Sequence, residues 1–193
     1  MDAFILLSKP WWVNLFILAP FIAFFFWKNG LAIQWRTLFF AMIFGISFGY
    51  VEGTVVVYLR EAFGDVSATS TAHEIFRQSN LLEKLPGRLI MIEVVREIAT
   101  IVMLLSIAFL SVQKFAERFA IFFWSFAFWD ISYYFSLWLA IGWPNSFTTS
   151  DILFLIPVPW RSQVWYPILI SSLFIIAILL RKKYVDTKKS SSI

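Results

Sequence analysis

Three ionisable side chains lie within five residues of one apolar segment, residues 88–112, and they are Glu93, Arg96 and Glu97. Residues four apart share one face of a helix, so Glu93 and Glu97 project together, with Arg96 on the adjoining flank. A charge at bilayer depth costs from about 2.5 to about 10 kcal/mol or more unless it is paired, protonated or hydrated. A passive anchor has no need of three such groups, so this pattern indicates a functional site.

Two other apolar segments carry one buried acid each, Glu52 and Asp130. Counting from the basic residue at the end of each segment, at about 1.5 Å per residue, Glu52 lies ~12 Å and Glu97 ~13 Å from the same membrane face. Asp130 lies ~18 Å from the opposite face, which is ~12 Å from the first in a core of about 30 Å. Three segments are therefore predicted to bring carboxyl groups to one level, where Arg96 also lies.

Four carboxyl groups against one arginine predict that at least one acid is protonated at pH 7 or that a cation is present. A neutral acid beside a carboxylate suits general acid–base chemistry. In the favoured interpretation, Glu52 or Glu97 protonates a double bond of an apolar lipid or isoprenoid-like substrate, and a second carboxylate removes a proton. The catalytic candidates are Glu52, Glu93, Glu97, Asp130 and Arg96. Tyr133 and Tyr134, three and four residues after Asp130, and the neighbouring Trp129 are expected to contact the substrate.

Other interpretations stay open. The acid–base reading requires no cofactor, but oxygen ligands from Glu52, Glu93, Glu97 and Asp130 would suit a divalent metal such as Mg²⁺, Ca²⁺ or Mn²⁺. A transporter, a proton relay or an assembly subunit would also carry intramembrane acids. Alternatively, these charged groups only stabilise the fold, through an ion pair between Arg96 and a glutamate and a hydrogen bond between Asp130 and a neighbouring helix. The single histidine, His73, lies in a polar stretch and is interpreted as solvated.

The composition is that of an integral membrane protein. The 193 residues are 60% hydrophobic and 20% aromatic, with a mean hydropathy of +0.77, whereas soluble domains are about 45–50% apolar. The absence of cysteine excludes disulfides, thiolate metal sites and cysteine catalysis. The net charge of +4 is placed at helix ends and in the tail, which indicates membrane-surface charge and argues against a nucleic-acid partner.

The apolar pattern predicts an all-α, polytopic bundle of five transmembrane helices. A single domain covers residues 1–183, and a disordered basic tail covers 184–193. Pro20 is expected to kink the first span, and a short surface helix is expected near residues 71–84. Two prolines stop an apolar run at about 152–160 that is too short to span, which predicts an interfacial or re-entrant segment. The predicted spans are 11–27, 35–59, 88–112, 119–143 and 164–180.

Basic residues gather in the turns at 28–36 and 113–118 and in the tail, which fall on one side of a five-span protein. The positive-inside rule makes that side cytoplasmic. We therefore expect an integral protein of a bacterial inner membrane, with its C-terminus in the cytoplasm and its N-terminus on the opposite side. The expected partner is a membrane lipid or an apolar small molecule. Whether the protein forms a homo-oligomer is left open by the sequence.

Short motifs in three of these segments resemble the emopamil-binding, or EXPERA, domain family, which includes sterol isomerases. Gly45 is followed seven residues later by Glu52-Gly53, as in the second span of that family. Glu93 or Glu97 followed by Thr100 is similar to its third span, and Asp130 followed by a Tyr-Phe pair is similar to its fourth. The chain also resembles a group of bacterial multi-pass membrane proteins.

The resemblance implies a membrane cavity lined by acids, with Phe48 and Thr100 among the substrate contacts. The isomerases of this family carry a catalytic histidine four residues before the motif glutamate, and here that position is Phe48. The resemblance therefore implies the cavity and its acids, without the histidine on which sterol isomerisation depends.

Overall fold

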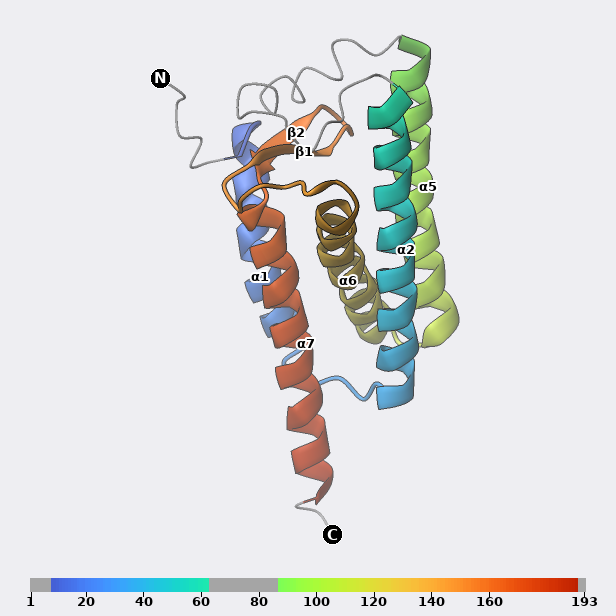
Figure 1. Cartoon of the computed structure of the whole chain (residues 1–193). Helices are drawn as coiled ribbons and strands as arrows, with labels where there is room; N and C mark the ends of the chain where they lie inside the picture. The colour runs from blue at the N-terminus through green and yellow to red at the C-terminus, as the bar shows by residue number, and fades with distance from the viewer. Residues whose placement is uncertain (1–7, 63–86, 191–193) are drawn as a thin grey trace.

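The computed structural model describes residues 8–62 and 87–190. That part of the chain is mostly helical, with a small two-stranded sheet at one end (Figure 1). The elements in chain order are η1 (Trp11–Leu18), α1 (Ala19–Phe26), α2 (Trp35–Ala62), α5 (Gly87–Ser111), α6 (Phe115–Ile141), β1 (Ser150–Phe154), β2 (Trp160–Gln163) and α7 (Trp165–Ser190).

Helix α6 is the centre of the fold, because α2, α5 and α7 all pack against it. Its contact with α2 is the most extensive, and the small residues of α2 explain why. A Cβ atom at Gly45 would lie 2.5 Å from the backbone oxygen of Ser125, and one at Gly49 would overlap the backbone oxygen of Trp129. The glycine stripe therefore lets the two backbones approach closely, as small residues do between membrane helices.

The first apolar segment changes helix type at its proline. Residues Trp11–Leu18 form a 3₁₀ helix, and the α-helix begins at Ala19 with Pro20 in its first turn. Proline lacks an N–H and is tolerated at the start of a helix, where that donor would have no partner. At Pro20, where the sequence predicts a kink, the structure has a junction between two helical forms.

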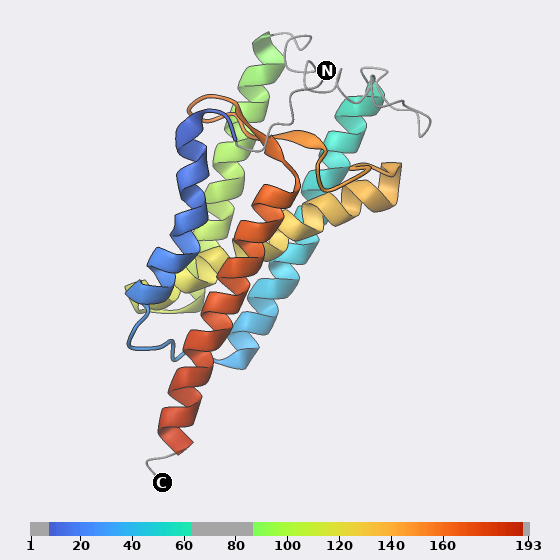
Figure 2. The same ribbon diagram turned by 90° about the vertical axis from the view of Figure 1, so that its left-hand side faces the viewer.

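The segment at 152–160 is a β-hairpin, which corrects the all-α prediction. Strand β1 pairs with β2 in antiparallel register from Ser150 opposite Gln163 to Phe154 opposite Trp160. The hairpin lies across the end of the bundle, next to the start of η1 (Figure 2). The two prolines that stop the apolar run occupy its turn, where a missing N–H breaks no strand pairing.

Helix α7 also differs from expectation, because it continues to Ser190 through residues for which the sequence predicts a disordered tail. The helix extends beyond the rest of the bundle at the end away from the hairpin (Figure 1). The basic residues of the tail therefore continue the last helix. His73 and the short helix expected near 71–84 lie outside the described residues.

Three helices are long and apolar enough to cross a membrane: Trp35–Leu59 of α2, Gly87–Ser111 of α5 and Trp165–Lys182 of α7. The first apolar helix, Trp11–Phe26, is shorter. Their outer faces are apolar as well as exposed; on α5, for example, Met91 is 63% and Leu110 82% exposed. Exposed apolar faces of this size are typical of helices that contact lipid.

Candidate functional site

A cavity of about 150 Å³ lies beneath the hairpin, and η1, α2, α5, α6, β1, β2 and α7 all contribute to its wall. A dry cavity of this size holds a group as large as a benzene ring. Most of the lining is aromatic or aliphatic. Its ionisable side chains, apart from tyrosines, are Glu52, Arg96, Glu97, Asp130 and Asp151.

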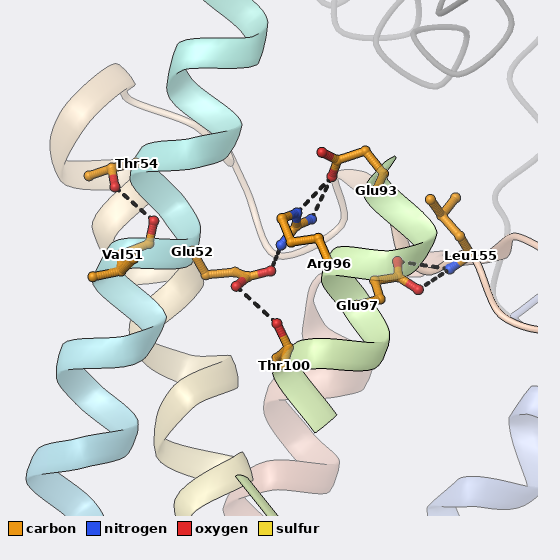
Figure 3. A network of polar contacts seen from close by, with 8 residues as sticks. All are labelled: Val51, Glu52, Thr54, Glu93, Arg96, Glu97, Thr100 and Leu155. Atoms are coloured by element: carbon orange, nitrogen blue, oxygen red, sulfur yellow. Dashed lines mark hydrogen bonds and ion pairs between the residues drawn. The ribbon is translucent and has the colours of Figure 1, made fainter. Parts of the chain in front are cut away.

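Arg96 connects α5 to α2 across one side of the cavity (Figure 3). Its Nη1 atom forms an ion pair with Oε1 of Glu52, and the other oxygen of Glu52 accepts a hydrogen bond from the Thr100 hydroxyl at 3.2 Å. Helices α2 and α5 otherwise have few contacts. The ion pair and this hydrogen bond therefore fix the spacing of the two helices at the level of the cavity.

Glu93 holds Arg96 from within α5. One of its carboxylate oxygens accepts hydrogen bonds from Nε of Arg96 at 2.8 Å and from Nη2 at 2.7 Å. Glu93 is 9% exposed but does not line the cavity. Of the five catalytic candidates, it is the one that the structure leaves outside the cavity wall, because the i, i+3 spacing turns it towards Arg96.

Glu97 projects from α5 away from α2 and towards the hairpin (Figure 3). The backbone N–H of Leu155 donates to both of its carboxylate oxygens, each at 2.9 Å. The side chain thus joins α5 to the hairpin turn and lines the cavity as well.

Two aspartates form the other side of the cavity. Asp130 of α6 is 7% exposed and accepts a hydrogen bond from the Ser171 hydroxyl of α7 at 2.7 Å. Asp151 of β1 accepts one from the Tyr134 hydroxyl at 3.0 Å. The Tyr134 side chain therefore reaches from α6 to the hairpin.

Aromatic rings close the cavity between the two acidic sides. Trp129 lies 6.3 Å from Tyr133 and 6.4 Å from Phe154, measured between ring centroids. Trp129 is 7% exposed, and its indole N–H has no hydrogen-bond partner within the described residues. Thr100, Trp129, Tyr133 and Tyr134 all line the cavity, whereas Phe48 does not and instead lies against Phe44.

Sequence reasoning did not select Asp151 or Ser171 for the site. Asp151 immediately precedes the apolar run that was expected to lie at the interface, and Ser171-Ser172 interrupts an otherwise apolar helix. A polar residue inside an apolar segment is the signal that could have identified Ser171. Asp151 carried no such signal, because only the hairpin brings it over the bundle.

The carboxyl groups are spread around the cavity and do not converge. Among residues 8–62 and 87–190, no group of three or more His, Cys, Asp or Glu side chains is placed to hold a metal ion. The described contacts therefore give no support to the carboxylate-bound metal site.

No protein-family model, no curated protein and no solved structure matches this chain. The resemblance to the emopamil-binding domain stays a prediction from short motifs, and function must be argued from the cavity.

Proposed function

We propose that the protein is a membrane-embedded acid–base enzyme that shifts a double bond in an uncharged lipid, such as an isoprenoid. The observation that carries the proposal is the cavity, where carboxyl groups from α2, α5, α6 and β1 line one space together with aromatic rings. Acids in a water-poor site can exchange protons with a carbon framework, and the faces of aromatic rings stabilise the cation formed on protonation.

The proposal places the cavity within a five-span bundle. Two helices join the three long apolar ones: η1 with α1, and α6, which packs between α2 and α7. Helix α6 carries Asp130 together with tryptophans and tyrosines, whose rings bear polar N–H and O–H groups. Surrounded by other helices, it can carry polar groups at membrane depth without exposing them to lipid.

The charges disfavour an anionic substrate. Four carboxyl groups line the cavity against one arginine, and Nη1, Nε and Nη2 of Arg96 are engaged by Glu52 and Glu93. An anionic headgroup would meet like charges in a low-dielectric space, where their repulsion is strong. The cavity volume of about 150 Å³ accommodates the reacting part of the proposed lipid, while the rest of it lies along the outer helix faces.

Deuterium transfer tests the proposal even when the product has not been identified. The purified protein, in lipid nanodiscs in D₂O, is given squalene, geranylgeraniol or a sterol, and each lipid is recovered and analysed by mass spectrometry. We expect one lipid to gain deuterium together with a shifted double bond, and D130N to lower the rate about 100-fold or more. Empty nanodiscs are the blank, and E117Q, at the start of α6, is the control variant.

Deuterium-free lipids from the unaltered protein would contradict the proposed chemistry. A proton flux across proteoliposomes made with the same preparation would then favour the relay interpretation.

A further inference from the structure

Asp130 and Ser171 meet at the buried contact between α6 and α7. Asp130 is 7% and Ser171 is 1% exposed, and both residues line the cavity. The Ser171 hydroxyl donates to Oδ2 of Asp130 at 2.7 Å. Neither side chain has a further hydrogen bond within the described residues. This single contact therefore fixes how the carboxyl group is oriented in the cavity wall.

The contact makes the two oxygens of Asp130 unequal. Oδ2 accepts the Ser171 hydroxyl, whereas Oδ1 has no hydrogen-bond partner in the described part of the chain. Those residues do not fully enclose Oδ1 either. Because Asp130 lines the cavity, Oδ1 is the oxygen that a ligand can reach.

The direction of the hydrogen bond determines which oxygen carries a proton. A hydroxyl that donates to one oxygen of a carboxylic acid makes that oxygen the carbonyl, so the proton is on the other oxygen. Asp130 forms no ion pair with the described residues, and its neutral form avoids the cost of an unpaired buried charge. As an acid, Asp130 therefore carries its proton on Oδ1, towards the cavity.

We propose, on the basis of the proposed function, that Ser171 is a positioning residue that keeps the proton-carrying Oδ1 of Asp130 directed at the lipid. Oδ1 gives its proton to one carbon of the double bond, which leaves a cationic centre on the other carbon. The same oxygen, now part of a carboxylate, removes a proton from the next carbon along the chain. The double bond moves by one position, and Asp130 is protonated again, with no oxidant, water or cofactor consumed.

The next residue, Ser172, provides a matched control. Its hydroxyl donates to the backbone oxygen of Ile168 at 2.7 Å, within α7, and the residue does not line the cavity. S172A therefore removes a serine hydroxyl from the same turn of α7 without changing the contact to Asp130.

Turnover kinetics test the positioning role in the deuterium assay, with the lipid that the unaltered protein accepts. We expect S171A to lower kcat about 10-fold or more and to leave KM nearly unchanged, because the lost hydrogen bond aligns the acid and does not hold the lipid. We expect S171T, which keeps a hydroxyl, to recover part of the rate, and S172A to match the unaltered protein. If S171A lowers the unfolding midpoint, S171C replaces it, because a thiol is only a weak donor. Unaltered kcat in the folded variant, or equal losses in S171A and S172A, would overturn the proposal.

Infrared spectroscopy tests the same contact without turnover. In an ester-free detergent, the C=O stretching band of a neutral carboxyl group is separate from the bands of the backbone and of carboxylates. We expect D130N to remove such a band and S171A to shift it to higher frequency, because the carbonyl loses its hydrogen bond. If the unaltered protein transfers no deuterium, the proposed function fails, and the band still tests the orientation of Asp130. A band that S171A leaves unchanged would refute the placement of the proton on Oδ1.

Discussion

Arg96 shows at the residue scale how a charge is accommodated inside an apolar bundle. Its guanidinium group has carboxylate partners on two helices, Glu52 on α2 and Glu93 on its own helix. An arginine can serve two carboxylates because its donors form a planar fork. The favoured sequence interpretation treated all five charged groups as catalytic, yet three of them, Glu52, Glu93 and Arg96, form a network that ties α5 to α2.

Replacement of Arg96 by methionine should therefore destabilise the protein. The change leaves the carboxyl groups of Glu52 and Glu93 buried without their cation, and breaking a buried pair from one side costs about 3 kcal/mol or more. We expect a clear fall in the free energy of unfolding, measured by denaturant titration in detergent. The double variant E52Q/R96M should recover part of the loss, because one uncompensated charge is removed.

The matched control is the Lys114–Glu117 pair, whose nitrogen and oxygen lie 3.8 Å apart with the lysine side chain 75% exposed. Exposed pairs contribute about 0–1 kcal/mol, so K114M should change stability little. Equal effects of R96M and K114M would show that the Arg96 network carries no special stabilisation.

At the scale of the elements, the close pairing of α2 and α6 depends on an absence of side chains. Gly45, Gly49 and Gly53 recur at every fourth residue, a pattern that predicts a close neighbouring helix, and the structure shows that this neighbour is α6. Prediction of the hairpin failed for a related reason. An apolar run that ends at two prolines is compatible with a strand, a lid or a re-entrant segment, and only its pairing with Trp160–Gln163 selects the strand.

The glycine stripe gives a test with an internal control. In G49A the new methyl group would overlap the backbone oxygen of Trp129, so the helices must separate, and we expect a loss of about 1–3 kcal/mol of stability. In G87A the new methyl group meets nothing within 4 Å, so stability should be unchanged or slightly higher. The unfolding midpoints of both variants in detergent check this, and an unaffected G49A would contradict the close approach.

At the scale of the whole molecule, the hairpin and the end of α7 lie at opposite ends of the bundle (Figure 1). The five-span proposal puts the hairpin outside the cytoplasm and the α7 end within it. The chain has no natural cysteine, so single introduced cysteines can report on each end. Phe147, beside the hairpin, is 65% exposed, and Tyr184, near the end of α7, is 49% exposed.

We expect a membrane-impermeant maleimide to label F147C in intact cells, and to label Y184C only after the cells are opened. The reason is that basic residues at the α7 end retain it on the cytoplasmic side. The cysteine-free protein provides the blank for both reactions. Labelling of both positions from the same side would contradict an arrangement that separates the two ends.

The sequence by itself predicted the long helices of a membrane protein and which polar groups they bury; its five spans stay a prediction, since three helices of the described residues are long and apolar enough to cross a membrane. These properties are local, because hydrophobic length and helical rise follow from the order of residues alone. It also indicated that Glu52, Arg96, Glu97 and Asp130 lie at one depth, and the structure places all four around one cavity.

Only the tertiary structure decided which groups share each side of that cavity. The depth of a residue along a helix does not determine how the helix is rotated about its axis, nor which side chains a distant segment contributes to the cavity. The hairpin carries Asp151 to Tyr134 and Leu155 to Glu97, while α7 carries Ser171 to Asp130. These contacts join residues that are between 17 and 58 positions apart, and such pairings depend on the packing of whole elements, which no local pattern encodes.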